Sequence, residues 1–283
     1  MTEKKIEGSS FRATVTIDSR NSRLKVQSFE GPGYQEMIDT CKSLAEEEKL
    51  GKIIWYLSTE AAPAGTEILQ QAGFIQEGKI PGFFKGQDAL CNAYFVDPDR
   101  AQSAYFEEEQ KILDQVRADK VPGKTEAPLP ANLTIRTLEE EDAKSLVSLY
   151  KAIFESYPSP LFDITYIKQI MRTHVYFMGV FEKGHLIAAG SAEMDLTNRN
   201  AEMTDLATRP EARGQGLGTS ILQALEEKMI ARQIPCLYSL VRAGVPSANR
   251  GLYKLGYHYQ GKHINNCHID GNYENMNIWS KKL

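Results

Sequence analysis

Cysteine is scarce in this chain of 283 residues, and its spacing argues against a C-x-x-C motif and against a cysteine metal site. None of the four cysteines belongs to a C-x-x-C pair; they are Cys41, Cys91, Cys236 and Cys267. None has a partner at metal-ligand spacing, so we expect free thiols in a reducing compartment and no metal site. The two histidines near Cys267 fall in an expected strand, which favours ordinary side chains over a metal cluster.

Long apolar runs and an excess of basic charge are also missing. No apolar segment approaches the length that spans a bilayer, and residues 1–10 are polar, without the apolar stretch of a secretion signal. The formal net charge is −4, which does not suggest a nucleic-acid-binding surface and is compatible with a cationic substrate. We therefore expect a cytoplasmic protein that binds neither membranes nor nucleic acid. The length allows two domains, each with its own core.

Glycine, in contrast, is concentrated in the hexapeptide RGQGLG at residues 213–218. A strand-like run at 203–208 precedes it, and a helix-like run at 219–231 follows it. Three glycines allow a tight turn that gathers backbone N–H groups at a helix N-terminus, where the partial positive charge favours an anion. Arg213 adds a cation suited to phosphate. The segment is therefore predicted to bind a pyrophosphate, against the alternative of a glycine-rich surface turn.

The spacing of the hexapeptide decides between the known phosphate loops. A dinucleotide fingerprint would need glycine at Thr219, and a P-loop would need Gly-Lys-Ser/Thr, which is absent. On its strand–helix turn, R-G-x-G-x-G resembles the pyrophosphate loop of the GNAT superfamily of N-acetyltransferases. That resemblance implies acetyl-CoA as co-substrate. The residues that it implies for the pyrophosphate and pantetheine are Leu206, Ala207, Thr208, Arg213, Gly214, Gln215, Gly216, Leu217, Gly218, Thr219 and Asn249.

Composition and periodicity divide the chain in two. A Pro- and Gly-containing linker is expected at 120–132, between domains at 1–119 and 133–283. After the linker the pattern predicts the order β, α, α, β, β, β, α, β, α, β, β, which is the order of a GNAT domain. The expected fold class is therefore α/β (α+β), a GNAT-type mixed central sheet flanked by helices.

The N-terminal part shows a weak internal repeat of the C-terminal one. When the two parts are aligned without a gap so that Leu57 meets Leu240, glycines and apolar strand positions coincide, as in Gly73-Phe74 and Gly256-Tyr257. The matched N-terminal segment lacks features of the phosphate loop. Glu30 and Pro32 occupy the positions of Arg213 and Gln215, and Gln35 replaces Gly218. We expect a degenerate GNAT-like half that does not bind CoA, with an unrelated α/β cap as the alternative.

Acetyl transfer to an amine also needs a group that accepts the ammonium proton. GNAT enzymes often carry this base on the strand before the loop, where Glu202 is the first candidate and Asp205 the second. Strand alternation places these two on opposite faces unless a bulge intervenes. Glu193 on the neighbouring strand is the third, and an ion-paired surface carboxylate is the alternative for each. Tyr253 is the candidate general acid, with water as acid and a packing role for Tyr253 as alternatives.

The acceptor pocket is expected between the first two helices of the C-terminal part, at residues 154–163. The candidate contacts for the acceptor are Glu155, Tyr157, Phe162 and Glu193. Over its whole length the chain resembles the β-lysine N-acetyltransferase family. That resemblance implies acetylation of the ε-amine of β-lysine, with a product that serves as a compatible solute or a catabolic intermediate. The residues themselves leave lysine, a polyamine, a protein amine or a non-catalytic acyl-CoA sensor open, and a homodimer as well. A zwitterionic acceptor would also need a cation, for which the candidates are Arg172, Arg199 and Arg242.

Overall fold

The computed structural model describes residues 1–60, 62–119, 129–269 and 271–283. Most of the expected linker, at 120–128, therefore lies outside the described residues. The elements of the N-terminal half are β1 (Thr2–Glu7), β2 (Arg12–Asp18), η1 (Ser19–Asn21), β3 (Arg23–Glu30), α1 (Tyr34–Glu47), β4 (Lys52–Ser58), α2 (Ala62–Gln71), β5 (Ile75–Phe84) and β6 (Gln87–Phe95). A connecting segment holds η2 (Pro98–Ala101) and α3 (Phe106–Ala118).

The C-terminal half follows the predicted order of elements. They are β7 (Leu133–Thr137), η3 (Glu140–Asp142), α4 (Ala143–Ile153), α5 (Ile164–Met171), β8 (Val175–Glu182), β9 (His185–Asp195), β10 (Asn200–Thr208), η4 (Pro210–Ala212), α6 (Leu217–Ala231), β11 (Cys236–Arg242), α7 (Pro246–Lys254), β12 (His258–Ile269) and β13 (Asn272–Lys282). The mixed sheet with flanking helices confirms the predicted fold class. Residues 98–119 do not form one helix, because η2 ends at Ala101 and α3 begins only at Phe106.

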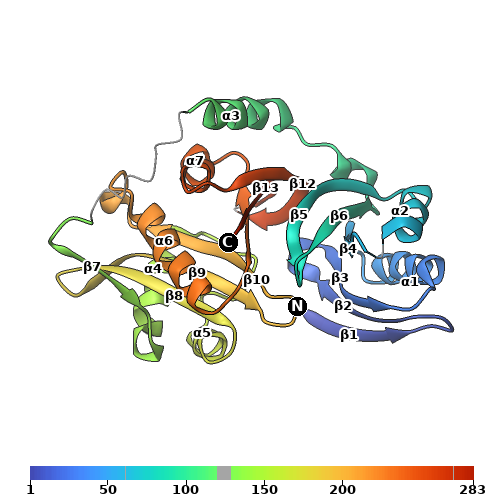
Figure 1. Cartoon of the computed structure of the whole chain (residues 1–283), viewed down its shortest axis with the longest axis horizontal. Coiled ribbons are helices and arrows are strands. Elements are labelled where there is room, and N and C mark those ends of the chain that lie inside the picture. The colour runs from blue at the N-terminus through green and yellow to red at the C-terminus, as the bar shows by residue number, and fades with distance from the viewer. Residues whose placement is uncertain (61, 120–128, 270) are drawn as a thin grey trace.

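All strands belong to one continuous sheet that passes from one half to the other (Figure 1). Its order is β1-β2-β3-β4-β6-β5-β12-β13-β11-β10-β9-β8-β7. Read outward from the β5–β12 junction, the halves repeat one order: β5, β6, β4, β3, β2, β1 on one side and β12, β13, β11, β10, β9, β8 on the other. This shared order supports the internal repeat over an unrelated cap. The division into separate domains remains a prediction.

Helices cover both faces of the C-terminal part of the sheet, which explains its apolar strands. β9 is buried along most of its length, because α6 packs on one face and α4 on the other. The face under α6 contains Met203, Ile221 and Leu237, and the opposite face contains Tyr150 and Phe177. A third apolar cluster lies under α1 in the N-terminal half. Each half is therefore stabilised by its own buried core.

Strand pairing corrects the gap-free alignment of the two halves in one pair of strands. Gly78 of β5 and Gly261 of β12 are matched in the gap-free alignment, and each follows a register shift in its strand pair. Through its partner on β6, Gly78 is in register with Tyr56 on β4. Through its partner on β13, Gly261 is in register with Leu240 on β11, so strand pairing matches Tyr56 with Leu240. The gap-free alignment instead matches Leu240 with Leu57, so it is wrong by one position in these two strands. Alternation along a strand makes such a slip exchange its two faces.

The two halves meet where the matched glycines pair with each other. Gly78 and Gly261 are direct partners in the β5–β12 ladder. A Cβ atom on Gly261, whose φ is +144°, would lie 2.2 Å from the Glu77 carbonyl oxygen and 2.6 Å from the Gly78 Cα. A side chain at this position would force the two backbones apart, so the junction depends on glycine.

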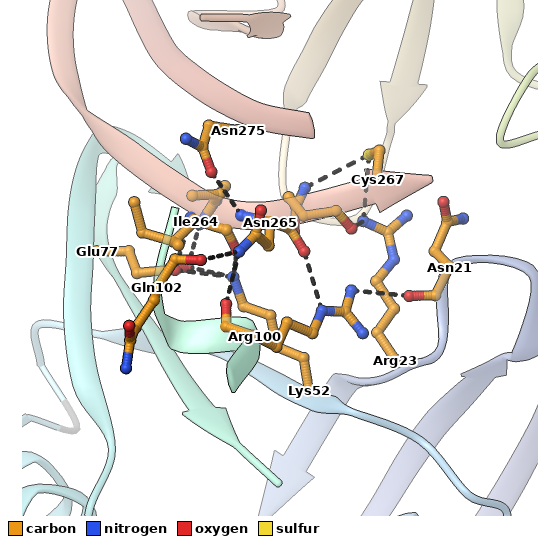
Figure 2. Close-up of polar contacts among 12 residues, drawn as sticks. Asn21, Arg23, Lys52, Glu77, Arg100, Gln102, Ile264, Asn265, Cys267 and Asn275 are labelled. Carbon is orange, nitrogen blue, oxygen red and sulfur yellow. Dashed lines mark hydrogen bonds and ion pairs between the residues drawn. The ribbon is translucent and has the colours of Figure 1, made fainter. Parts of the chain in front are cut away.

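Cations of the N-terminal half and of the connecting segment bind a bulge of β12 across the same junction (Figure 2). Three successive carbonyl oxygens of the bulge accept hydrogen bonds from them. The pairs are Lys52 Nζ to Ile264 at 2.7 Å, Arg100 Nε to Asn265 at 3.0 Å, and Arg23 Nη1 to Asn266 at 3.0 Å. Lys52 is itself neutralised by the buried carboxylate of Glu77 at 2.8 Å. The halves are thus joined by hydrogen bonds from buried cations to backbone carbonyls, as well as by the sheet.

Replacing Gly261 by alanine is expected to lower the free energy of unfolding by about 2–5 kcal/mol, from overpacking and backbone strain together. Urea unfolding followed by circular dichroism measures this change. Gly184→Ala is the matched control, because Gly184 also has positive φ (+82°) but no neighbouring atom within 4 Å of an added Cβ. The control should lose only about 1 kcal/mol. Equal losses in the two variants would show that close approach at the junction is unimportant.

Candidate active site

The glycine hexapeptide forms an open turn at the N-terminus of α6. Gly214 and Gly216 have positive φ (+80° and +74°), and Gly216 is the N-cap residue of α6. The first helical hydrogen bond runs from Ser220 N to the Gly216 carbonyl, so the amides of residues 217–219 lack an intrahelical acceptor. Cβ atoms added at Gly214, Gly216 or Gly218 would meet nothing within 4 Å. Accessible N–H groups at a helix N-terminus form an anion site.

The matched turn before α1 is filled by the protein itself. Gly33 is the N-cap residue of α1 and donates its N–H to the Ser10 carbonyl at 3.2 Å. A Cβ atom on Gly31 would lie 2.4 Å from that same carbonyl oxygen. The Glu36 carboxylate in the first turn of α1 accepts hydrogen bonds from the amides and hydroxyls of Ser9 and Ser10. No space for a phosphate remains there, which supports the prediction that only the C-terminal half binds CoA.

An open strand edge leads away from the turn before α6. β10 and β11 pair in parallel only from Asn200 to Glu202, opposite Cys236 to Tyr238. In the described chain, residues 203, 204, 207 and 208 of β10 pair with β9, and the ladder with β11 does not continue beyond Glu202. The Met203 carbonyl accepts a hydrogen bond from Ser239 Oγ of β11 at 2.7 Å, and no β11 partner is found for residues 204–208 among the described residues. This edge includes the predicted contacts Leu206, Ala207 and Thr208. Its free backbone groups can hydrogen-bond an extended ligand lying between the two strands.

A β-bulge in β10 brings two of the predicted carboxylates to one face of the sheet. The register with β9 shifts between Thr204 and Ala207, and Asp205 has φ of +55°. The extra residue interrupts strand alternation, so Asp205 turns towards the face that carries Glu202. Asp205 accepts hydrogen bonds from Tyr157 OH at 2.7 Å and Ser191 Oγ at 2.6 Å. Burial raises its pKa to about 6, against the effect of these hydrogen bonds.

Glu202 is the less restrained of the two carboxylates. Its hydrogen-bond partner in the described structure is Tyr238 OH, at 3.3 Å. Burial and then the charge of Glu193 raise the pKa of Glu202 to about 7, while Lys25 opposes this rise. A carboxylate that titrates near neutral pH and keeps an oxygen free for a ligand suits general-base catalysis.

Glu202 lines a cavity of about 140 Å³ between the two halves. The N-terminal half contributes Lys25, Val26, Gln27, Ile54, Tyr56, Phe83 and Phe84, and the C-terminal half contributes Asp195, Asn198, Glu202, Tyr238, Leu240 and Asn266. Leu240 lies two residues beyond the last β10–β11 pair, so the cavity lining continues past the point where these two strands separate. We call this space the inter-half cavity.

Two predicted residues lie outside this arrangement. Tyr253 OH donates to the Arg117 carbonyl of α3 at 3.1 Å, where α3 packs against α7. Asn249 is fully buried, and all its amide hydrogen bonds are internal. Its Nδ2 donates to the carbonyls of Arg242 and Val245, and its Oδ1 accepts from Asn277 and Trp279. Both polar atoms of the Asn249 side chain thus have internal partners, which argues against the expected contact with CoA, and that contact stays a prediction.

The predicted acceptor residues are only partly brought together. Tyr157 reaches the site through Asp205, but Glu155 is exposed and Phe162 packs in the apolar cluster of α4 and α5. Glu193 is exposed, 3.7 Å from His174 Nε2. The inter-half cavity is not lined by any of residues 154–163, so the acceptor pocket expected between the two helices stays a prediction.

The three arginines considered for an acceptor carboxylate do not line the inter-half cavity either. Arg172 pairs with Glu140, Arg199 donates to the Gln233 carbonyl, and Arg242 lies 4.0 Å from Glu274. The cation of the cavity is Lys25, which sequence reasoning missed. The internal repeat was a signal for this role of Lys25, because it indicated that the N-terminal half has sheet strands of its own. It did not indicate that β3 would face β10.

Three further observations concern the described chain. None of its helices is long and apolar enough to cross a membrane. No cluster of three or more His, Cys, Asp or Glu side chains suited to a metal occurs among these residues. The four cysteines are buried free thiols, which confirms the expectation of unpaired cysteine.

Comparison with known proteins agrees with this geometry. The model of the Acetyltransferase (GNAT) family matches residues 143–257, which include the bulge and the glycine turn. N-acetyltransferase YodP of Bacillus subtilis is 34% identical over 280 residues, covering 99% of each chain. Beta-lysine N(6)-acetyltransferase of Methanosarcina mazei is 33% identical, covering 88% of this chain and 98% of the relative. The protein of the same name from Methanococcus maripaludis is 30% identical, covering 94% and 95%.

Proposed function

The chain belongs to the GNAT family and is an N-acetyltransferase, and from this premise we propose that it transfers acetyl from acetyl-CoA to the ε-amine of β-lysine. The observation that carries the proposal is the path of β10, whose open edge runs from Glu202 at the inter-half cavity to the open turn before α6. The names of the relatives from Methanosarcina mazei and Methanococcus maripaludis support β-lysine as the acceptor.

In the proposed complex, each part of the path has one task. The amides before α6 and Arg213 bind the pyrophosphate, and the backbone of 206–208 hydrogen-bonds the pantetheine and the thioester carbonyl. Glu202, directly or through a water, takes a proton from the substrate ammonium, and the free amine attacks the carbonyl carbon. The C–N bond forms, the attacking nitrogen releases its second proton to water, the C–S bond breaks, and the thiolate leaves. Water is the proposed proton donor to this thiolate, because Tyr253 is engaged with α3.

The enclosure of the cavity supports a small acceptor over a protein amine. Arg20 of η1 donates to the Tyr157 carbonyl at 2.7 Å, so the N-terminal half also contacts the loop between α4 and α5. A cavity of about 140 Å³ closed by two halves accepts a short aliphatic chain more readily than a folded surface. This contact also argues against an independent sensor half.

Thiol release on mixing the protein with acetyl-CoA and single amines tests the proposal. β-Lysine, lysine, spermidine and a lysine-containing peptide form the panel, and mass spectrometry with NMR locates the acetyl group. We expect the highest kcat/KM with β-lysine and acetylation at N6. Tight CoA binding without thiol release for any amine would instead favour a non-catalytic acyl-CoA sensor. Faster turnover of the peptide would reject the small-molecule acceptor.

A further inference from the structure

Lys25 is a cation without a partner in the inter-half cavity. It lies on β3 and is partly buried, yet among the described residues it has neither a hydrogen bond nor an ion pair. The charge of Arg23 and then burial lower the pKa of Lys25. Holding an unpaired ammonium in a confined space costs free energy, which an anionic group of a ligand would recover.

Asn266 supplies a second group that points to a ligand. It lines the same cavity and is almost fully buried, and its Oδ1 has no hydrogen-bond partner in the described structure. Its backbone is fixed, because Arg23 donates to its carbonyl at 3.0 Å. A buried amide oxygen without a donor is destabilising, and a ligand N–H group would satisfy it.

The strand register explains why Lys25 and Glu202 face one space. Lys25 pairs with Ile54 and Glu202 pairs with Tyr238, and these two partners are matched in the corrected register of the repeat. The two side chains thus project from matched strands into the inter-half cavity, where the positive charge of Lys25 acts on Glu202. The cavity thus contains a cation from the N-terminal half and the proposed base from the C-terminal half.

We propose that the N-terminal half selects a diamino acid, with Lys25 binding its carboxylate and Asn266 Oδ1 accepting from the amino group near that carboxylate. This inference rests on the proposed function, and it names the chemical class of its acceptor. The distal amine then lies towards Glu202 and the open edge of β10. Polyamines carry no carboxylate for Lys25 and place a like charge against it, so the same cavity discriminates against them.

The test compares β-lysine with 1,4-diaminopentane, which is the same molecule without its carboxylate. In wild-type protein, kcat/KM should be about 10- to 100-fold higher for β-lysine, the range expected for one charged hydrogen-bonded contact. Lys25→Met should remove this preference by lowering kcat/KM for β-lysine while changing that for 1,4-diaminopentane less than about twofold. Lys25→Arg should restore part of the preference. Asn266→Ala should weaken both substrates, because both keep that amino group.

Assays at pH 8.5 limit any effect of Lys25 on the ionisation of Glu202. Lys5→Met is the matched control, since Lys5 is an exposed lysine of β1 outside the cavity, and it should behave as wild type. Equal losses of both substrates in Lys25→Met, or no loss of either, would overturn the proposal.

Calorimetry with CoA-saturated protein separates this inference from the proposed reaction. β-Lysine should bind about 10- to 100-fold more weakly to Lys25→Met than to wild type, whether or not turnover occurs. Failure of the proposed function would appear as absent thiol release in wild type, with this binding difference intact. Failure of the inference would appear as equal β-lysine affinity in the two proteins, or as no β-lysine binding to wild type.

Discussion

Replacing Glu202 by glutamine is expected to lower kcat/KM for the amine about 100- to 1,000-fold at pH 7, the loss typical of a missing general base. A lysine-type ammonium has a pKa of about 10.4, so roughly one molecule in 2,500 is free amine at that pH. Without a carboxylate in the cavity, the reaction depends on this small fraction. Steady-state thiol release measures the change, and the dissociation constant of CoA should stay within about threefold.

The direction in which kcat/KM changes with pH provides a second test of Glu202 as the base. Glu202 accepts a proton only when ionised, and its pKa is about 7, so wild-type kcat/KM should fall as the pH drops below 7. The glutamine variant should lack this acidic limb and recover activity towards pH 10, where the amine deprotonates without help. Glu227→Gln, an exposed carboxylate of α6, is the control and should match wild type. If Asp205→Asn removes the limb and Glu202→Gln does not, Asp205 is the base.

Converting Arg213 to glutamate should weaken CoA binding by about 100-fold or more. The substitution removes a charge-assisted contact worth about 1.5–3 kcal/mol and adds a repelling carboxylate beside the pyrophosphate. It also copies the residue found at the matched position, Glu30. Calorimetric titration with CoA measures the affinity, and kcat at saturating acetyl-CoA should change little.

The reverse substitution, Glu30→Arg, provides the matched control. It restores the cation at the turn before α1, but the Ser10 carbonyl and the Glu36 carboxylate still occupy that turn. We expect the CoA stoichiometry to remain one per chain in wild type and in this variant. A second bound CoA in either protein would contradict the inference that the N-terminal turn is closed.

Local signals made much of the fold predictable. Helix periodicity and glycine placement predicted the turn at 213–218 and the order of elements around it, because these features depend on neighbours in sequence. β1 was missed, since its sequence TEKKIE is polar and exposed and takes its place by pairing with β2. Apolar alternation cannot reveal such an edge strand.

The site was less predictable, because long-range contacts build it. Alternation alone left Glu202 and Asp205 on opposite faces, and only the pairing of β10 with β9 reveals the bulge that reorients Asp205. Asn249 looked available on a short helix, but Asn277 and Trp279 of β13 occupy its amide. Lys25 could not be placed, since its role depends on two halves meeting through glycines that are far apart in the sequence.

The pairing of Gly78 with Gly261 has a consequence for symmetry. An interface in which a residue contacts its own equivalent is the kind that two identical subunits form around a twofold axis. In such a homodimer, the positions of Lys25 and Glu202 would carry the same side chain, and both ends of the shared cavity would have the same charge. Covalent linkage of the halves lifts this constraint. One chain can therefore place lysine at one position and glutamate at the other, and so give a symmetric scaffold a polar axis along which an asymmetric molecule binds in one direction.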